Sequence, residues 1–248
     1  MYCNLPLPIV ILSTPRVGST ALFLDVVSRY IDTPDLVWLN EPITGAKKKD
    51  NFIDSIKSGN FIIKAHALDL AMHYPESFKE RIKDCSLIRI RRRNKIEQYI
   101  SMYIAISTGN WGGNLYGTFD NWYENLIIPY NETIFLECIN RIFWHNLKID
   151  SISYNPNFDL YYEDLGCLKN GISHFNSDDV NNFKEVRKGD AFYKKNPRIQ
   201  NYEQIKELFA SPIVRQLELV ASRVNFKNPH HVSILYNRIL KNFKGYEI

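Results

Sequence analysis

The sequence predicts an α/β fold with a P-loop-like, three-layer arrangement, in which helices flank a central parallel sheet. Two observations support this fold class. Short apolar runs alternate along the chain with longer segments of helical periodicity, as in proteins built from βαβ units. The first apolar run is followed directly by a tight loop and then by a helix. Because no repeat or low-complexity tract divides the chain, we expect a single domain over residues 1–248.

The predicted strands are short apolar runs. The first, Leu7 to Leu12, is rich in β-branched residues and has the continuous apolar character of a buried parallel strand. The others, in chain order, are Phe61 to Lys64, Cys85 to Ile90 and Phe158 to Tyr162.

Helical segments are expected between and after these runs. The helix that follows the first strand carries an apolar stripe from Leu22 to Tyr30. A second helix is expected from about Lys95 to Ile106, because its apolar residues follow the spacing i, i+4, i+7, i+8. The remaining predicted helices are Glu132 to Lys148, Gln204 to Phe209, Pro212 to Ser222 and Leu235 to Ile248.

Composition narrows the class of protein. The chain has 31 basic and 27 acidic residues, and the net charge of +4 suits a small anionic ligand without indicating nucleic acid. It contains no run of about 18 apolar residues, so no transmembrane segment is expected. Met1 to Pro8 lacks the features of a secretory signal, and we expect a cytoplasmic protein. Isolated cysteines without a CxxC pair disfavour zinc.

The loop after the first strand has the chemistry of an anion-binding site. Such a loop turns backbone N–H groups towards an anion, and the next helix adds its positive N-terminus. Gly18 permits close backbone approach, and Arg16 supplies a cation. The Walker A pattern is absent. An ordinary strand-to-helix turn capped by Ser or Thr is the alternative. The residues of this loop are Thr14, Pro15, Arg16, Val17, Gly18, Ser19 and Thr20.

Arg93 and Ser101 form a second candidate. Arg93 follows the end of a predicted strand, and two turns of the next helix bring the hydroxyl of Ser101 back towards that end. A guanidinium and a hydroxyl are suitable donors for a phosphate dianion. The alternative for the run from Arg89 to Arg93 is a solvated basic patch or, less favoured, a nucleic-acid contact.

Four segments, in order, resemble parts of the sulfotransferases that use 3′-phosphoadenylyl sulfate (PAPS). TPRVGST at 14–20 is similar to the loop that binds the 5′-phosphosulfate. RRRNKIEQYIS at 91–101 is similar to the segment that binds the 3′-phosphate. FIIKAH at 61–66 resembles the K-T-H segment of the cytosolic branch, and FDLYYEDL at 158–165 resembles a strand that ends in Y-E-D-L.

The bacterial carbohydrate sulfotransferases are an especially similar branch. Their R-D-K-x-x-Q-x-x-S pattern is matched from Arg93 onward, with Asn94 in place of the usual Asp, and a later Trp recurs. The matched segments span Ile9 to Leu165, about two thirds of the chain.

The resemblance implies a role for each matched position. Thr14 to Thr20 would hold the 5′-phosphosulfate, and Arg93 and Ser101 would hold the 3′-phosphate. Tyr162 would lie near the nucleotide. Arg16 stands where many members carry a lysine. Because arginine keeps its charge and does not give up a proton, we expect Arg16 to stabilise charge on the leaving oxygen.

Two residues compete for the role of general base towards the acceptor hydroxyl. His66 matches the catalytic histidine of the cytosolic branch, and Lys64 matches its neighbour; a neutral imidazole suits proton abstraction near neutral pH. Glu41 lies where the bacterial carbohydrate branch places a carboxylate base, and it would need burial or a neighbouring charge to raise its pKa. A histidine satisfied within the core is the alternative for His66. The sequence leaves the choice of base open.

Two later segments are weaker candidates. Arg187, Lys188 and Gly189 match an R-K-G loop that contacts the 3′-phosphate in many members of the family. The residues that follow depart from the family, so an exposed basic loop is the alternative. The glycine-containing stretch from Thr108 to Thr118 is expected to cover or select the acceptor.

These features predict a PAPS-dependent sulfotransferase. It would transfer a sulfuryl group to a hydroxyl acceptor, such as a carbohydrate or glycolipid, and release adenosine 3′,5′-bisphosphate. No metal and no nucleic-acid partner are expected. One alternative is a P-loop nucleotide kinase or other phosphotransferase, against which the missing Walker lysine counts. The other is a nucleotide- or nucleic-acid-binding module without catalytic activity. The sequence indicates neither the identity of the acceptor nor an oligomeric state.

Overall fold

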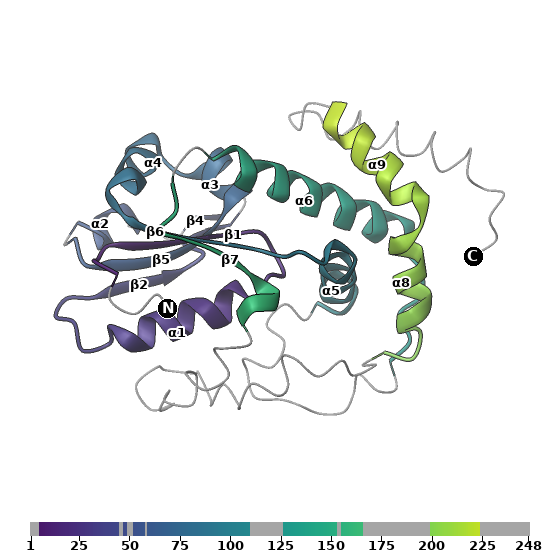
Figure 1. Ribbon diagram of the computed structural model, residues 1–248, viewed down its shortest axis with the longest axis horizontal. Helices are drawn as coiled ribbons and strands as arrows, with labels where there is room; N and C mark the ends of the chain where they lie inside the picture. The colour runs from purple at the N-terminus through teal and green to yellow at the C-terminus, as the bar shows by residue number, and fades with distance from the viewer. Residues whose placement is uncertain are drawn as a thin grey trace. The chain divides into compact units, whose positions relative to one another are not determined.

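A five-stranded, all-parallel sheet confirms the expected α/β class (Figure 1). The computed structural model describes residues 5–44, 47–48, 52–57, 59–109, 126–152, 155–165 and 199–223. The order across the sheet is β2-β5-β1-β6-β7. These strands are β1 (Ile9–Ser13), β2 (Val37–Asn40), β5 (Phe61–His66), β6 (Ser86–Arg91) and β7 (Phe158–Tyr161).

Helices cover both faces of this sheet, which gives three layers. Side chains along a strand alternate between the faces, so Ile9 and Ile11 of β1 point the same way. They pack against helix α1 (Ser19–Arg29). Val10 and Leu12 of β1 point the other way and pack in a separate core with α3 (Ala67–His73) and α4 (Glu76–Arg81) on the other face.

Two compact units are recognised by their internal contacts. Among the described residues, the first unit holds 5–93 and 145–165, and the second holds 94–109, 126–144 and 199–223. The second unit has a core in which the rings of Tyr99 and Phe209 stack. The expected single domain stays a prediction. The helices of the second unit are α5 (Lys95–Thr108), the first part of α6 (Glu132–Ser151), α8 (Tyr202–Ala210) and α9 (Pro212–Arg223).

Several short elements complete the first unit. Strands β3 (Ile43–Thr44) and β4 (Lys47–Lys48) form an antiparallel pair. Helix α2 (Phe52–Ser55) and a 3-10 turn over Ile82–Asp84 lie between the strands of the sheet in sequence. Of the helices in the described ranges, none has the length and apolar character needed to cross a membrane.

Four of the five strands agree with the sequence prediction, including β7 at one edge of the sheet, and β2 at the other edge does not. The strand predicted at Phe61 to Lys64 continues to His66, so the polar residues at its end belong to the strand. No strand is predicted at β2, although a short apolar run, Leu36 to Leu39, lies there. The helix predicted at Leu235 to Ile248 lies outside the described residues.

Candidate functional site

Polar side chains meet at the carboxyl ends of β1 and β5. Within β5, Lys64 follows Ile62 by two residues and points to the same face, towards α1. The parallel register places Ser13 directly opposite His66. Glu41 comes directly after β2, and its backbone N–H donates to the carbonyl of Lys64 at 2.9 Å. Three neighbouring strands therefore deliver polar groups to one edge of the sheet, where ligands of open α/β sheets bind.

Glu41 is the centre of this cluster. Its Oε1 atom accepts from Nζ of Lys64 at 2.6 Å and lies 3.0 Å from Nε2 of His66. The ammonium of Lys64 also donates to Oγ1 of Thr20, at 2.7 Å. The Lys64 side chain is 3% exposed, His66 is 13% exposed and Glu41 is 27% exposed. The two residues that compete for the role of base are thus in direct contact, and the lysine ties them to the loop.

The charges of this cluster depend on one another. Burial by itself raises the pKa of the Glu41 carboxyl, but the attraction and hydrogen bonds of His66 and Lys64 outweigh burial and hold that pKa well below its ordinary range. Burial is the main reason that the pKa of the Lys64 ammonium is lowered; ionised Glu41 opposes this, and the positive charge of Arg16 adds to it. The cluster therefore holds an ionised carboxylate beside a buried lysine whose positive charge is opposed by burial and by Arg16.

Backbone geometry sets Glu41 apart from an ordinary loop residue. Its φ of 49° lies in the left-handed region, which a side chain with a Cβ disfavours, and Pro42 follows it. Such a conformation costs about 1–3 kcal/mol and persists where the surrounding contacts hold it. Here, the contacts are the backbone hydrogen bond to Lys64 and the side-chain contacts of Oε1.

The loop between β1 and α1 contains two left-handed residues. Arg16 has φ 63° and Gly18 has φ 68°. Gly18 precedes α1, which begins at Ser19, and Thr20 follows on the first turn. Thr14, Pro15, Val17 and Ser19 are buried, and Arg16 is partly exposed. A side chain at position 18 would meet the ring of Tyr162, because a Cβ built there lies 2.8 Å from Cδ2. Gly18 is thus required by the ring that packs on it, as well as by its φ.

Arg92 supports this loop, although the sequence pattern pointed to Arg93. It alternates with Ile88 and Ile90 of β6, which face α1, and so extends to the same side. Its guanidinium donates to the carbonyl of Arg16 at 3.3 Å and lies 4.5 Å from the centre of the Tyr162 ring. Tyr162 therefore packs between the loop and Arg92, and its predicted place near a nucleotide stays a prediction.

Arg93 and Ser101 belong to different parts of the chain. Arg93 forms a two-point ion pair with Asp164, at 2.7 and 2.8 Å, and both side chains are about half exposed. Ser101 lies on α5 in the second unit. Asn94 explains one departure from the resembled pattern, because its side chain accepts from the N–H of Glu97 and caps α5 as an Asp would.

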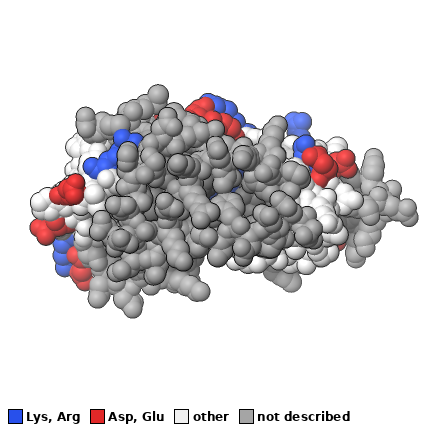
Figure 2. All heavy atoms as spheres, turned by 90° about the horizontal axis from the view of Figure 1, so that it is seen from below, with Lys and Arg blue, Asp and Glu red and all other residues white. Residues whose placement is uncertain are grey.

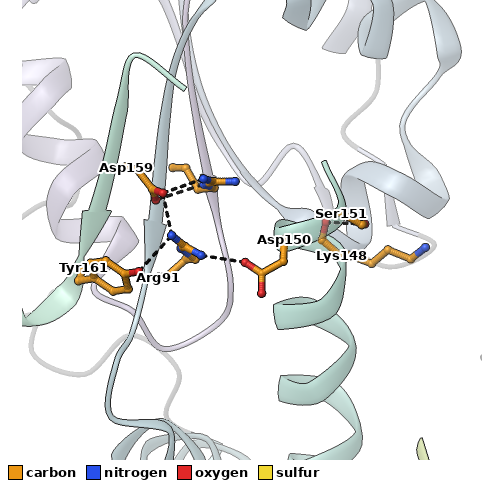
Figure 3. Close-up of polar contacts among 7 residues, drawn as sticks. Arg91, Lys148, Asp150, Ser151, Asp159 and Tyr161 are labelled. Carbon is orange, nitrogen blue, oxygen red and sulfur yellow. Dashed lines mark hydrogen bonds and ion pairs between the residues drawn. The ribbon is translucent and has the colours of Figure 1, made fainter. Parts of the chain in front are cut away.

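The other arginines of this run are engaged by carboxylates. Arg89 and Arg91 lie opposite Asp159 and Tyr161 of β7, and both guanidinium groups contact Asp159 at 2.7 Å. Arg91 also contacts Asp150 of α6 at 2.9 Å, so that it lies between two carboxylates (Figure 3). Positive and negative side chains are also mixed on the face shown in Figure 2, where the described basic and acidic residues lie next to each other in small groups.

Three residues in or next to this cluster escape the sequence reasoning. Ser13 ends β1, and its Oγ lies 2.9 Å from Nδ1 of His66, a contact that the sequence does not indicate. Arg92 could have been found from the alternation of side chains along β6. His145 gives no signal in the sequence, because only the fold brings its buried ring edge-to-face with His66, 5.5 Å away between centres.

Some predicted positions lie outside the described residues. They are Arg187, Lys188 and Gly189, and also most of the stretch from Thr108 to Thr118. Within the described ranges, no group of three or more His, Cys, Asp and Glu side chains is arranged to hold a metal ion.

Comparison with known proteins adds no assignment. No protein-family model matches the chain, and no curated protein sequence matches it. The function must therefore be argued from the site itself and from the resemblance of its motifs.

Proposed function

We propose that this chain is a sulfotransferase that takes the sulfuryl group from PAPS to a hydroxyl acceptor. The observation that carries the proposal is the double contact of Lys64, which donates to Thr20 of the loop and to Glu41. One buried cation thus connects an anion-binding loop to a pair of proton-accepting groups. Sulfuryl transfer needs both parts in one place.

The loop and its cations suit a polyanionic co-substrate. The N-terminus of α1 and the hydroxyl of Thr20 can donate to the 5′-phosphosulfate, and Lys64 and Arg16 place positive charge beside it. Arg16 would stabilise the negative charge that develops on the leaving oxygen, and arginine does this without giving up a proton. By resemblance, Arg93 and Ser101 serve the 3′-phosphate.

The reaction needs a place for one proton. The oxygen of the acceptor forms a bond to sulfur, the bond from sulfur to the bridging oxygen breaks, and adenosine 3′,5′-bisphosphate leaves. The proton of the acceptor hydroxyl passes to the pair of Glu41 and His66. The two groups lie 3.0 Å apart, so the acceptor hydroxyl can approach both of them at once.

Binding of the co-substrate prepares this pair. An anion bound on the loop attracts Lys64 as well, so the electrostatic attraction of Lys64 for Glu41 becomes weaker. The pKa of Glu41 then rises from its depressed value, which makes its carboxylate a better proton acceptor. The acceptor we propose is a carbohydrate or glycolipid hydroxyl, on the resemblance to the bacterial carbohydrate branch.

Calorimetric titration tests the nucleotide part of the proposal. We expect adenosine 3′,5′-bisphosphate to bind well ahead of ATP and of oligonucleotides, and the affinity to fall in Arg93→Ala and in Ser101→Ala. Equal affinity for ATP would favour a phosphotransferase. Affinity for oligonucleotides alone would favour a binding module, although the ion pairs of Arg89 and Arg91 with carboxylates speak against one.

A transfer assay tests the reaction. Radiolabelled PAPS is incubated with a collection of sugars and small alcohols, and labelled products are separated. We expect transfer to at least one sugar hydroxyl by the unchanged chain, and transfer slower by about 10²- to 10⁴-fold in Glu41→Gln. Binding of the nucleotide without transfer to any acceptor would leave a nucleotide-binding protein and overturn the enzymatic part.

A further inference from the structure

The His66 ring is held at both of its nitrogens. Nδ1 lies 2.9 Å from Oγ of Ser13, and Nε2 lies 3.0 Å from Oε1 of Glu41. Ser13 is fully buried. Its hydroxyl has a second, longer contact to the carbonyl of Ala65, at 3.4 Å. Each ring nitrogen therefore has its own partner, and the two partners differ in what they can do.

Glu41 determines whether Nε2 of His66 carries a hydrogen. An ionised carboxylate only accepts hydrogen bonds, so a contact of 3.0 Å requires a hydrogen on Nε2. A neutral imidazole has one N–H, and Nδ1 is then an acceptor. Ser13 has a hydroxyl hydrogen that can go to Nδ1 or to the carbonyl of Ala65. The contact with Nδ1 is shorter by 0.5 Å, from 3.4 to 2.9 Å, and is the stronger one.

We propose that Ser13 is a positioning residue for His66: its hydroxyl donates to Nδ1 and fixes the ring in the form whose proton lies on Nε2, facing Glu41. The proposal rests on the proposed function and deepens it. With Nδ1 facing a buried hydroxyl and Nε2 facing a carboxylate, the more exposed Glu41 receives the proton of the acceptor, and His66 orients Glu41.

The surroundings of His66 agree with this assignment. Described groups near the Glu41–His66 pair include Ser13 of β1, Lys64 from the same strand as His66, Thr20 beyond it on α1 and the ring of His145 from α6. The His145 ring contacts His66 edge-to-face and packs it in place. Among these described neighbours, Ser13 is the group within hydrogen-bond distance of Nδ1.

The ¹⁵N spectrum of the His66 side chain tests the proposal on the unliganded chain, at about pH 8, above the ordinary pKa of imidazole. We expect the unchanged chain to show Nε2 protonated and Nδ1 with a lone pair. Ser13→Ala should shift the Nδ1 signal strongly, and Ser13→Thr, which keeps the hydroxyl, should restore it. Protonation at Nδ1, alone or together with Nε2, would overturn the proposal, and so would an unchanged spectrum in Ser13→Ala.

Ser86 provides a matched control for loss of a buried strand hydroxyl. It lies at the start of β6, is buried, and donates to the carbonyl of Pro6 at 2.6 Å. Ser86→Ala should leave the His66 signals where they are. If Ser86→Ala shifts them as much as Ser13→Ala does, the effect is a general loosening of the fold and the assignment of Ser13 is wrong.

Activity separates this proposal from the proposed function. Ser13→Ala should lower kcat for sulfate transfer by about 10- to 100-fold, the usual size of the loss when an imidazole loses the partner that orients it, because the His66 ring then no longer holds Glu41 in place. Its affinity for adenosine 3′,5′-bisphosphate should stay unchanged. If the spectra behave as expected but the unchanged chain transfers no sulfate, the positioning role stands and the sulfotransferase proposal fails.

Discussion

Two clusters of opposite charges lie in the first unit, and they differ in what surrounds them. At the ends of β1 and β5, Lys64 is almost fully buried and shares Glu41 with His66. On β6 and β7, Arg89 and Arg91 share Asp159 at the surface. Each cluster has a carboxylate that contacts two nitrogen-bearing groups. The burial of the lysine changes the pKa values in the first cluster and gives it a chemistry that the partly buried arginines around the exposed Asp159 lack.

The largest expected difference is in activity. Glu41→Gln removes the proton acceptor while keeping the size of the side chain, and we expect sulfate transfer to fall by about 10²- to 10⁴-fold, the usual contribution of a positioned base. Steady-state kinetics with PAPS measures the change. Nucleotide affinity, followed by calorimetry, should survive it.

Asp159→Asn is the matched control for this change, because it makes the same carboxyl-to-amide replacement between two arginines. Its transfer rate should stay within about twofold of the unchanged chain, as for an exposed charge remote from the chemistry. Similar losses in both variants would mean that the two clusters do not differ in function.

The loop between β1 and α1, which contacts the first cluster through Thr20, is the next test. Gly18→Ala should lower the free energy of unfolding by about 1–3 kcal/mol, because φ at this position is left-handed and the added Cβ would lie 2.8 Å from the Tyr162 ring. Urea denaturation measures the loss. In a Tyr162→Leu background the penalty of Gly18→Ala should shrink, since part of the clash is gone. If Gly18→Ala lowers the free energy of unfolding equally in both backgrounds, the loss comes from the left-handed φ alone and not from the clash with the ring.

Acid denaturation separates the clusters by pH. The folded pKa of Glu41 lies below its ordinary value of 4.5, so its ionised form adds stability above that pH. This stability is lost as the pH falls through the depressed folded value. We expect the free energy of unfolding to fall less steeply below about pH 4.5 in Glu41→Gln than in the unchanged chain.

Asp164→Asn is the control at the surface. The two-point hydrogen bond to Arg93 lowers the pKa of Asp164 as well, but both side chains are exposed, so solvent screens the interaction. Its stability curve should follow the unchanged chain closely. A curve that matches Glu41→Gln would show that burial is not what distinguishes the two carboxylates.

The smallest expected effect concerns Arg93. Asp164 occupies both donors that a phosphate would use. If Arg93 binds the 3′-phosphate, it must exchange one anion for another, and Asp164→Asn should raise the affinity for adenosine 3′,5′-bisphosphate a few-fold. Calorimetry measures it, and Asp164→Asn combined with Arg93→Ala should remove the gain. An unchanged affinity in Asp164→Asn would argue against Arg93 as the phosphate ligand.

The sequence predicts the central strands and helices better than it predicts which side chains contact one another. The buried strand that ends in Ser13 and the helix that follows are predicted because apolar runs and periodicity are local signals. The candidates Glu41, Lys64 and His66 were identified singly, on their chemistry and resemblance. Their contact could not be predicted, because it depends on the order of the strands in the sheet, and β2 was not among the predicted strands.

Arg92 and Arg93 show the same limit. A run of arginines indicates positive charge, but which one reaches the loop depends on the parity of a strand and on where that strand ends. Arg93, the residue with the resembled spacing, contacts Asp164, and Arg92 contacts the loop. No local pattern in the sequence indicates the contact of His145 with His66, because the helix that carries His145 lies far from His66 along the chain.

The packing of Tyr162 on Gly18 has a consequence for how related sequences vary. A ring that fills the space of a missing side chain makes the two positions dependent on each other, although they are far apart in the chain. A relative that keeps an aromatic residue at position 162 must keep glycine at position 18. Where a small residue replaces the ring, the steric restriction at position 18 is relieved. Positions 18 and 162 should therefore covary, and an alignment of relatives can reveal that dependence without any measurement on this chain.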